Sequence, residues 1–441
     1  MIISPEQILQ NTYTFAVNDF RQLKEKLLNW LEQFGSFSFL DNHQYQFTPH
    51  TQECLIAAGA KRKLHIQTGK ALNALQKFID ESKSKWLFGH LNYDLKNEID
   101  NLSSHHEDRI GFPDTFFFEP EIVIRLTENE ISITHPDAKN ILEAIESVPI
   151  KKASIGDHLI NVKNRITKED YITVIEKLKA HLLKGDAYEI NFCQEFFAEN
   201  AVIDPYKVYK ALSALSPNPF SGFYRVEDKW LLCASPERFL KKEGARVLSQ
   251  PMKGTSRRVS DDKEKDFLNK EALFHSGKDR SENVMVVDVV RNDLARICKE
   301  GTVQVDELYG IYSFPQVHQM VSTISGTLED TISFTDIIRA VFPMGSMTGA
   351  PKKRVMELIE KYERTRRGIF SGAIGYIDPQ GDFDFNVVIR SIMYNSTTEY
   401  LSYQAGSGIT FYSDAEQEWE ECILKAEAMT KVIQQAGLKS I

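Results

Sequence analysis

Residues 371–394 read SGAIGYIDPQGDFDFNVVIRSIMY, and this stretch carries the clearest structural signal in the chain. Two runs rich in β-branched and aromatic residues flank a Pro-Gln-Gly-Asp turn, which predicts two strands joined as a hairpin. Residues 399–411, EYLSYQAGSGITF, predict a third strand directly afterwards. Because short turns join antiparallel strands, the C-terminal part of the chain is expected to contain an antiparallel sheet.

Helical patterns lie between these strand-like runs. Thr167 and Asp170 form a capping-box pattern at the start of one predicted helix, and a strand is predicted to follow near Tyr188. Further helices are predicted over 270–298 and over 413–437, where Gly437 closes the second. Hairpins interspersed with long helices indicate an α+β protein.

The composition excludes several functional classes. The chain has 441 residues with 42% hydrophobic content and a net charge of -9, so a globular protein with a sizeable core is expected. No basic stripe is present to bind phosphates, and no apolar run is long enough to cross a membrane, so neither nucleic acid nor a membrane is an expected partner. The ligand is therefore expected to be a small molecule.

The N-terminus and the cysteines indicate the compartment. The opening MIISPEQILQNTYTF lacks a basic segment followed by an apolar one, so no secretory signal is expected and the protein is predicted to be cytoplasmic. Five cysteines are scattered without CxxC pairs, which predicts reduced packing residues.

Three glutamates are candidate ligands for a metal ion. Glu418 and Glu421 lie three apart on the predicted C-terminal helix and therefore share one face. Together with Glu282 they offer hard oxygen ligands suited to Mg²⁺ if the three converge in space. The alternative interpretation is a solvated acidic face.

Two glycine-containing segments are candidate anion sites. Gly406 and Gly408 allow a ligand to approach the backbone closely, although an ordinary turn or bulge also explains them. Ser346 precedes Pro351, at which a helix can begin whose N-terminus attracts anions. The spacing of a phosphate-binding P-loop is absent.

Seven segments occur in an order that resembles one family, the chorismate-utilising enzymes, which comprise anthranilate, aminodeoxychorismate, isochorismate and salicylate synthases. The segments are SPERF, QPMKGT, KDRSENVMVVDVVRND, GSMTGAPK, SGAIGY, QAGSGI and EQEWEECILKAE, and they span roughly 160–435. The N-terminal third is similar chiefly through FGHLNYDLKNE at 88–98. No linker divides the chain, so an N-terminal portion over 1–155 is expected to merge with a chorismate-binding catalytic portion over 156–441.

The resemblance implies a fold and a ligand set. The fold is two large antiparallel sheets packed face to face with helices outside. The resemblance assigns Mg²⁺ to Glu282 and Glu421, with Glu418 assisting directly or through water. It also implies that chorismate is held by a set of side chains and backbone amides: Thr255, Ser346, Arg390, Ala405, Gly406 and Gly408.

Lys253 separates the branches of this family. Aminodeoxychorismate synthases resemble this chain in carrying lysine between Pro-x and Gly-Thr, whereas anthranilate synthases typically carry alanine. The implied role is a nucleophile that adds to C2 of chorismate, with Glu237 protonating the departing C4 hydroxyl before ammonia attacks C4. Lysine attacks only as a free amine, so its pKa is expected to be lowered by burial or by Arg257 and Arg258. The alternatives are a solvated surface lysine and a Glu237 that simply pairs with Arg238.

Three positions depart from relatives. Glu189 stands where isochorismate and salicylate synthases resemble each other in using a lysine to activate water, so water addition at C2 is not expected. Gln319 replaces a histidine found in many relatives, and Phe370 replaces a tyrosine.

The source of nitrogen is expected to be external. No cysteine-centred elbow of a glutamine amidotransferase is present, so ammonia is expected in free form or from a separate glutamine amidotransferase subunit (component II). The resemblance thus points to amination of chorismate at C4, for 4-aminobenzoate and folate synthesis. The alternatives are an anthranilate synthase component and a catalytically silent subunit that binds chorismate or an amino acid.

Overall fold

The computed structural model describes residues 11–45, 54–150, 160–259, 261–314 and 317–436. Within these ranges, twenty strands form one hydrogen-bonded network in which every pairing between named strands is antiparallel. The network folds into two layers that share β3 (Cys54–Ile66) and β5 (Thr115–Leu126), because one end of β5 pairs with β6 and the other with β4.

The first layer contains the strands that surround β20. In order across the sheet they are β7 (Lys163–Asn164), β8 (Glu189–Ala198), β20 (Tyr400–Ile409), β19 (Ser391–Asn395), β10 (Lys229–Ser235), β9 (Phe220–Val226), β2 (Ser36–Asp41), β3, β5, β6 (Glu130–Thr134) and β1 (Thr12–Ala16). The short β16 (Gly349–Ala350) pairs with the start of β8.

The second layer runs from β5 to β14. Its order is β5, β4 (Leu87–Leu91), β17 (Ala373–Ile377), β18 (Phe383–Val387), β11 (Arg238–Glu243), β12 (Arg246–Gln250), β15 (Val317–Thr327) and β14 (Gln304–Ser313). β13 (Met252–Arg257) continues beyond β12 along the same edge of β15.

The two layers pack against each other through close contacts. A Cβ added to Gly222 on β9 would lie 2.9 Å from the Ile374 side chain on β17. Asn386 on β18 also donates a hydrogen bond of 2.6 Å to the Phe220 carbonyl on β9. The predicted fold of two antiparallel sheets packed face to face is therefore confirmed.

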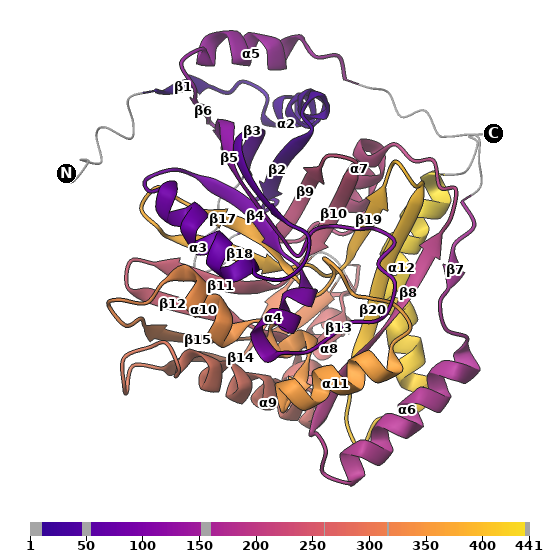
Figure 1. Ribbon diagram of the computed structural model, residues 1–441. Helices are drawn as coiled ribbons and strands as arrows, with labels where there is room; N and C mark the ends of the chain where they lie inside the picture. The colour runs from indigo at the N-terminus through magenta and orange to yellow at the C-terminus, as the bar shows by residue number, and fades with distance from the viewer. Residues whose placement is uncertain (1–10, 46–53, 151–159, 260, 315–316, 437–441) are drawn as a thin grey trace.

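Helices cover the outer faces of both layers (Figure 1). Over the first layer lie α2 (Phe20–Trp30), α5 (Ala138–Ser147), α6 (Lys168–Leu183), α7 (Pro205–Leu215) and α12 (Ala415–Ala436), whose apolar faces join one hydrophobic core with the strands. Over the second lie α3 (Ala71–Glu81), α8 (Lys263–His275), α9 (Gly277–Leu294) and α10 (Phe334–Val341), while α4 (Lys96–Asp100), α11 (Lys352–Tyr362) and the short 3₁₀ turns η1 (Leu31–Gln33), η2 (Tyr93–Leu95) and η3 (Gly345–Met347) connect strands.

The predicted start of one helix and the presence of the C-terminal helix are confirmed. α6 begins after Thr167, whose hydroxyl accepts a hydrogen bond from the Asp170 backbone, and α12 occupies the predicted C-terminal helix. Gly437 lies outside the described residues. The single helix predicted over 270–298 is wrong, because the chain divides there into α8 and α9. Ser276 has extended backbone angles and its hydroxyl accepts from the Asp279 backbone, so it caps a new helix.

The strand expected to run through Arg390 is also divided. Arg390 has a φ of 50°, in the left-handed region that strands do not use, so β18 ends before it and β19 begins after it. This places the Arg390 side chain at a bend between two strands.

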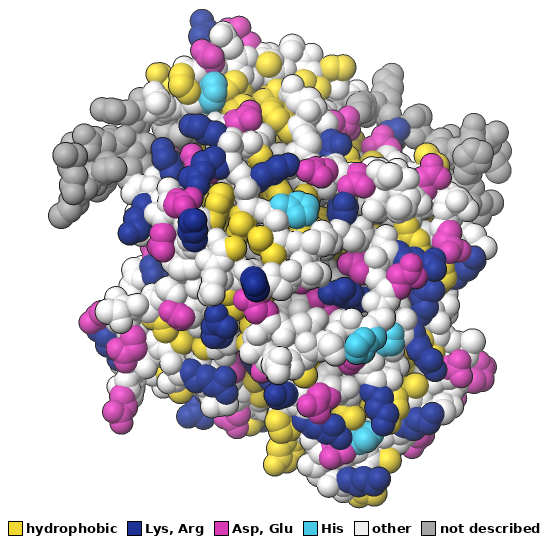
Figure 2. Space-filling view, viewed as in Figure 1, with side chains coloured by type: hydrophobic (Ala, Val, Ile, Leu, Met, Phe, Trp, Pro, Cys, Tyr) yellow, Lys and Arg dark blue, Asp and Glu magenta, His cyan; other side chains and the backbone are white. Residues whose placement is uncertain are grey.

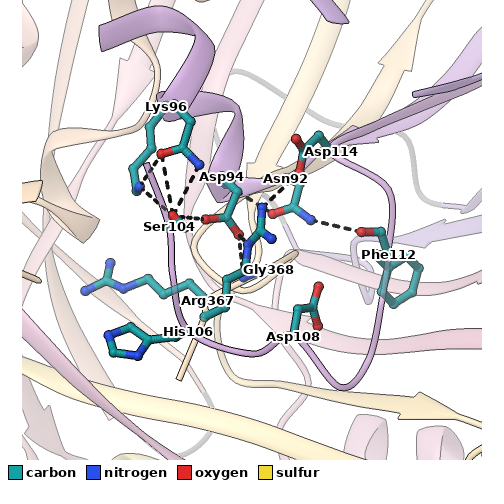
Figure 3. A network of polar contacts seen from close by, with 12 residues as sticks. Asn92, Asp94, Lys96, Ser104, His106, Asp108, Phe112, Asp114, Arg367 and Gly368 are labelled. Carbon is teal, nitrogen blue, oxygen red and sulfur yellow. Dashed lines mark hydrogen bonds and ion pairs between the residues drawn. The ribbon is translucent and has the colours of Figure 1, made fainter. Parts of the chain in front are cut away.

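The FGHLNYDLKNE segment joins the N-terminal part of the chain to the rest (Figure 3). Asp94 accepts a hydrogen bond of 3.2 Å from the Gly368 backbone and another of 2.8 Å from the Ser104 hydroxyl, and it pairs with Arg366 at 2.9 Å. Asn92 donates to the Phe112 carbonyl at 3.2 Å. The contacts of Asp94 with Arg366 and Gly368, together with the pairing of β4 with β17, connect residues more than 270 positions apart in sequence.

The surface and the cysteines agree with the composition. Lysine and arginine are interspersed with aspartate and glutamate over the face shown in Figure 2, without a basic stripe. Across the described ranges, no helix has the length and apolar character required to cross a membrane. All five cysteines are buried and none of them forms a disulfide, as predicted: Cys54, Cys193, Cys233, Cys298 and Cys422.

Candidate active site

Lys253 lies beside residues of two other strands, β8 and β20. Its ammonium on β13 donates a hydrogen bond of 2.5 Å to Glu189 Oε1 at the start of β8. A Cβ added to Gly408 on β20 would lie 2.4 Å from Glu189 Oε1 and 2.7 Å from Lys253 Nζ. The glycine therefore makes room for the pair. Because only 11% of the Lys253 side chain is exposed, the interpretation as a solvated surface lysine is wrong.

The charges around Lys253 differ from those expected. Burial by itself lowers the pKa of Lys253, but the carboxylates of Glu189 and Glu282 oppose this effect and hold the pKa above its ordinary value. The expected lowering is thus not found. Arg257 is exposed and Arg258 pairs with Asp266 at 3.0 Å, so the two arginines have other environments.

Glu237 is a buried acid directly before β11. The Ser346 hydroxyl donates a hydrogen bond of 2.6 Å to Glu237 Oε1. Burial raises the pKa of Glu237 to about 7, although Ser346 and Lys253 act in the opposite direction. The alternative pairing with Arg238 is wrong, because the Arg238 guanidinium pairs with Asp384 at 2.9 Å. Glu237 therefore has the proton affinity that a general acid needs near neutral pH.

Residues that the sequence analysis did not identify position Ser346. The Asn191 side chain on β8 donates a hydrogen bond of 2.6 Å to the Ser346 carbonyl, and Arg367 donates one of 2.6 Å to the Met347 carbonyl. Asn191 follows Glu189 by two residues, so the period of a strand places both side chains on the same face. That spacing was the available signal for Asn191, whereas nothing local in the sequence marks Arg367.

The three candidate metal ligands come from two helices. Glu282 lies on α9, and both Glu418 and Glu421 lie on α12. Lys278 Nζ contacts carboxylates of both helices, since it lies 3.5 Å from Glu418 Oε1 and 3.9 Å from Glu282 Oε1. Glu421 instead pairs with Lys425 at 2.7 Å. The carboxylates thus face a common region with lysines between them.

The donor set fits a divalent cation in part. Within the described ranges, no three His, Cys, Asp or Glu side chains lie close enough together to form a ready metal site. However, Glu282 Oε1 and Glu418 Oε2 are buried and have no hydrogen-bond partner among the described residues. Burial raises the pKa of Glu282 to about 7, against the charge of Lys253. Buried oxygens without partners are the kind of group that a hard cation satisfies.

The other residues predicted to contact the substrate differ in their burial and in their neighbours. Arg390 lies near enough to Glu237 for their charges to interact, although burial lowers the Arg390 pKa. Thr255 is exposed on β13, and Ala405 is buried on β20. A Cβ added to Gly406 would lie 2.0 Å from the Phe192 carbonyl, so close pairing of β8 with β20 already requires glycine there.

Two of the departures from the family pattern, Gln319 and Phe370, are buried. Gln319 on β15 pairs in register with Thr255, and its Oε1 has no hydrogen-bond partner within the described part of the chain. Phe370 belongs to a hydrophobic core that includes side chains from both layers. The amide can still bind a polar ligand, whereas the phenyl ring cannot donate a hydrogen bond.

Comparison with known proteins agrees with this architecture. Residues 35–431 match the family model described as chorismate binding enzyme, and the chain belongs to this family. It is 32% identical over 366 residues to aminodeoxychorismate synthase component 1 of Bacillus subtilis (strain 168), which covers 78% of this chain and 76% of that protein. It is 30% identical over 401 residues to the protein of the same name from Escherichia coli (strain K12), covering 88% of this chain and 87% of that protein.

A solved structure has the same fold. The crystal structure of anthranilate synthase component I from Streptococcus pneumoniae TIGR4 has a TM-score of 0.76 and 25% identity, and the match covers 88% of this chain and 93% of that chain. The chain is therefore an enzyme of the chorismate-utilising class.

Proposed function

We propose that this chain aminates chorismate at C4 and produces 4-amino-4-deoxychorismate. The observation that carries the proposal is the largely shielded Lys253, whose ammonium hydrogen-bonds to the Glu189 carboxylate and lies near enough to the buried acid Glu237 for their charges to interact. A lysine at this place can act as a nucleophile once its ammonium has lost a proton, and a glutamate with a pKa of about 7 is an acid that can protonate a leaving hydroxyl.

The chemistry divides into two substitutions. In the first, Lys253 Nζ adds to C2, the two ring double bonds shift, and the C4 hydroxyl leaves as water with a proton from Glu237. In the second, ammonia adds to C4, the double bonds shift back, and the C2–N bond to Lys253 breaks. The Glu237 carboxylate then accepts a proton from the new ammonium group, so the enzyme returns to its starting state.

Glu282 and Glu421 would hold Mg²⁺, with Glu418 assisting, and the ion would supply positive charge to a carboxylate of chorismate. The unpartnered oxygens of Glu282 and Glu418 support this assignment. The resemblance supports Arg390, Ser346, Thr255 and the backbone at 405–408 as the groups that orient the substrate. Ser346 has a second function in this proposal, since its hydroxyl binds Glu237.

A separate glutamine amidotransferase subunit would supply the ammonia. The relatives named component 1 support a two-component enzyme, whose product would lead to 4-aminobenzoate and folate in the cytoplasm. Anthranilate synthase is the second candidate, because the matched crystal structure is a component of that enzyme. The catalytically silent alternative is disfavoured, since Glu237 and Glu418 are buried and Lys253 is largely shielded from solvent, as suits groups that take part in chemistry.

The deciding experiment is turnover of chorismate by the purified chain with ammonium and Mg²⁺. We expect a product with the mass of 4-amino-4-deoxychorismate and no fluorescence of anthranilate. A Lys253→Ala variant is the matched control. Anthranilate as the main product of the wild-type chain would contradict the proposal, as would unchanged chorismate.

A further inference from the structure

Glu189 is closely packed at its backbone, and its carboxylate is buried beside Lys253. The strand β16 lies so close that a Cβ on Gly349 would come within 2.1 Å of the Glu189 carbonyl. Only 2% of the Glu189 side chain is exposed. Its Oε1 accepts from Lys253, while Oε2 is buried and has no hydrogen-bond partner among the residues that the structure describes. One oxygen of this acid is thus engaged and the other is available.

Lys253 must lose a proton before it can attack carbon. The charged groups that face it are Glu189 on β8, Glu282 on α9, Glu421 on α12 and Glu237 before β11. Of these carboxylates, Glu189 is the one that hydrogen-bonds to Nζ within the described chain. Glu282 and Glu421 interact with lysines of their own helices, and Glu237 must keep a proton for the leaving hydroxyl.

We propose that Glu189 is the proton acceptor that converts Lys253 into a nucleophile and retains this proton until the lysine is released. The inference rests on the proposed function and adds a residue to it. A buried acceptor at hydrogen-bond distance transfers the proton without exchange with solvent, which suits two side chains that are 11% and 2% exposed.

The proton balance closes over the whole reaction. The Lys253 ammonium transfers one proton to Glu189, and the resulting neutral amine adds to C2 and becomes a secondary ammonium. When ammonia adds to C4, the C2–N bond breaks and Lys253 leaves as a neutral amine. Glu189 then returns its proton to Nζ, and the pair is restored.

The test measures formation of the covalent adduct directly. Wild-type enzyme is mixed with chorismate and Mg²⁺ without ammonia, quenched at short times, and the peptide containing residues 250–258 is weighed by mass spectrometry. Glu189→Gln keeps the shape but cannot take a proton, and Glu189→Asp keeps the base on a shorter side chain. Glu195→Gln is the matched control, because Glu195 is a buried acid six residues later on β8 that binds Tyr400 and Ser402 instead.

We expect the adduct to form at least about 100-fold more slowly in Glu189→Gln at pH 7, with partial recovery in Glu189→Asp and no change in Glu195→Gln. The ratio of the Glu189→Gln rate to the wild-type rate should rise with pH, because hydroxide replaces the missing acceptor. Glu237 is present in both proteins, so its titration cancels in this ratio, whereas the pKa of Glu282 falls in Glu189→Gln because a neighbouring negative charge is lost.

The outcomes separate this inference from the proposed function. Adduct formation in Glu189→Gln as fast as in wild type, or faster, would overturn it and show that the pair only holds Lys253 protonated. A pH-independent deficit would also overturn it, since a structural defect has no reason to be relieved by hydroxide. If the wild-type enzyme forms neither adduct nor aminated product, the proposed function itself fails.

Discussion

Replacing Glu237 with glutamine tests whether burial raises the pKa of this acid. Burial raises the pKa of Glu237 from its ordinary value of 4.5 to about 7, so the folded protein binds this proton more tightly than the unfolded chain. The stabilising contribution is therefore complete below pH 4.5 and is lost as the pH rises through about 7. Each tenfold change in proton affinity is worth about 1.4 kcal/mol, so the loss amounts to about 3 kcal/mol.

Glutamine does not ionise, so the variant escapes this loss. We expect the free energy of unfolding of Glu237→Gln, relative to wild type, to increase by about 2 to 3 kcal/mol between pH 5 and pH 8.5. Urea unfolding followed by tryptophan fluorescence at both pH values measures this difference. Glu282 titrates in the same range, but it is present in both proteins and cancels.

Although Glu237→Gln should gain stability relative to wild type at high pH, its rate of chorismate amination should fall. Without the acid, chorismate amination should slow by roughly 10² to 10⁴, and the decline in wild-type rate above pH 7 should disappear from the residual activity. Ser346→Ala removes a hydrogen bond that lowers the Glu237 pKa, so the wild-type decline should move to higher pH. Parallel stability curves for wild type and Glu237→Gln, or an undiminished rate in the variant, would show that the buried carboxyl is not the acid.

Four further outcomes are expected. Lys253→Ala should abolish the quenched adduct and sharply slow amination at C4. Lys253→Arg should restore neither, because guanidinium stays protonated. Normal kinetics in the alanine variant would show that Lys253 has only a structural role. Excess chelator should stop turnover. Glu421→Gln should lose most activity while its thermal unfolding stays near that of wild type. Turnover that persists in chelator would contradict the assignment of a metal site. The purified chain should use ammonium salts but not glutamine until a glutaminase subunit is added, as measured by product formation with each nitrogen source. Gly408→Ala should separate Glu189 from Lys253, because its Cβ would lie 2.4 Å from the carboxylate, so loss of adduct formation with retained circular dichroism is expected.

The amino-acid sequence predicts the parts of the fold that depend on local pattern. The hairpin at 371–394, the cap at Thr167 and the C-terminal helix follow from turn residues, capping residues and helical periodicity. The break at Ser276 was missed, since both flanking segments are helical and a serine within a helical run carries only a weak signal. Arg390 was likewise assigned to a continuous strand, because its left-handed backbone depends on packing at a bend.

In the candidate site, too, some features follow from the sequence and others depend on the tertiary structure. Ordered motifs were enough to nominate Lys253, Glu237 and the three helical glutamates, because a family resemblance preserves residue types along the chain. The pairing of Lys253 with Glu189 joins residues 64 positions apart, and the direction of the Lys253 pKa depends on that distance and on burial. The interaction between two charges depends on their separation and on the exclusion of water. Only the packing of β8 against β13 and β20 could therefore reveal which carboxylate sets the direction of the Lys253 pKa shift.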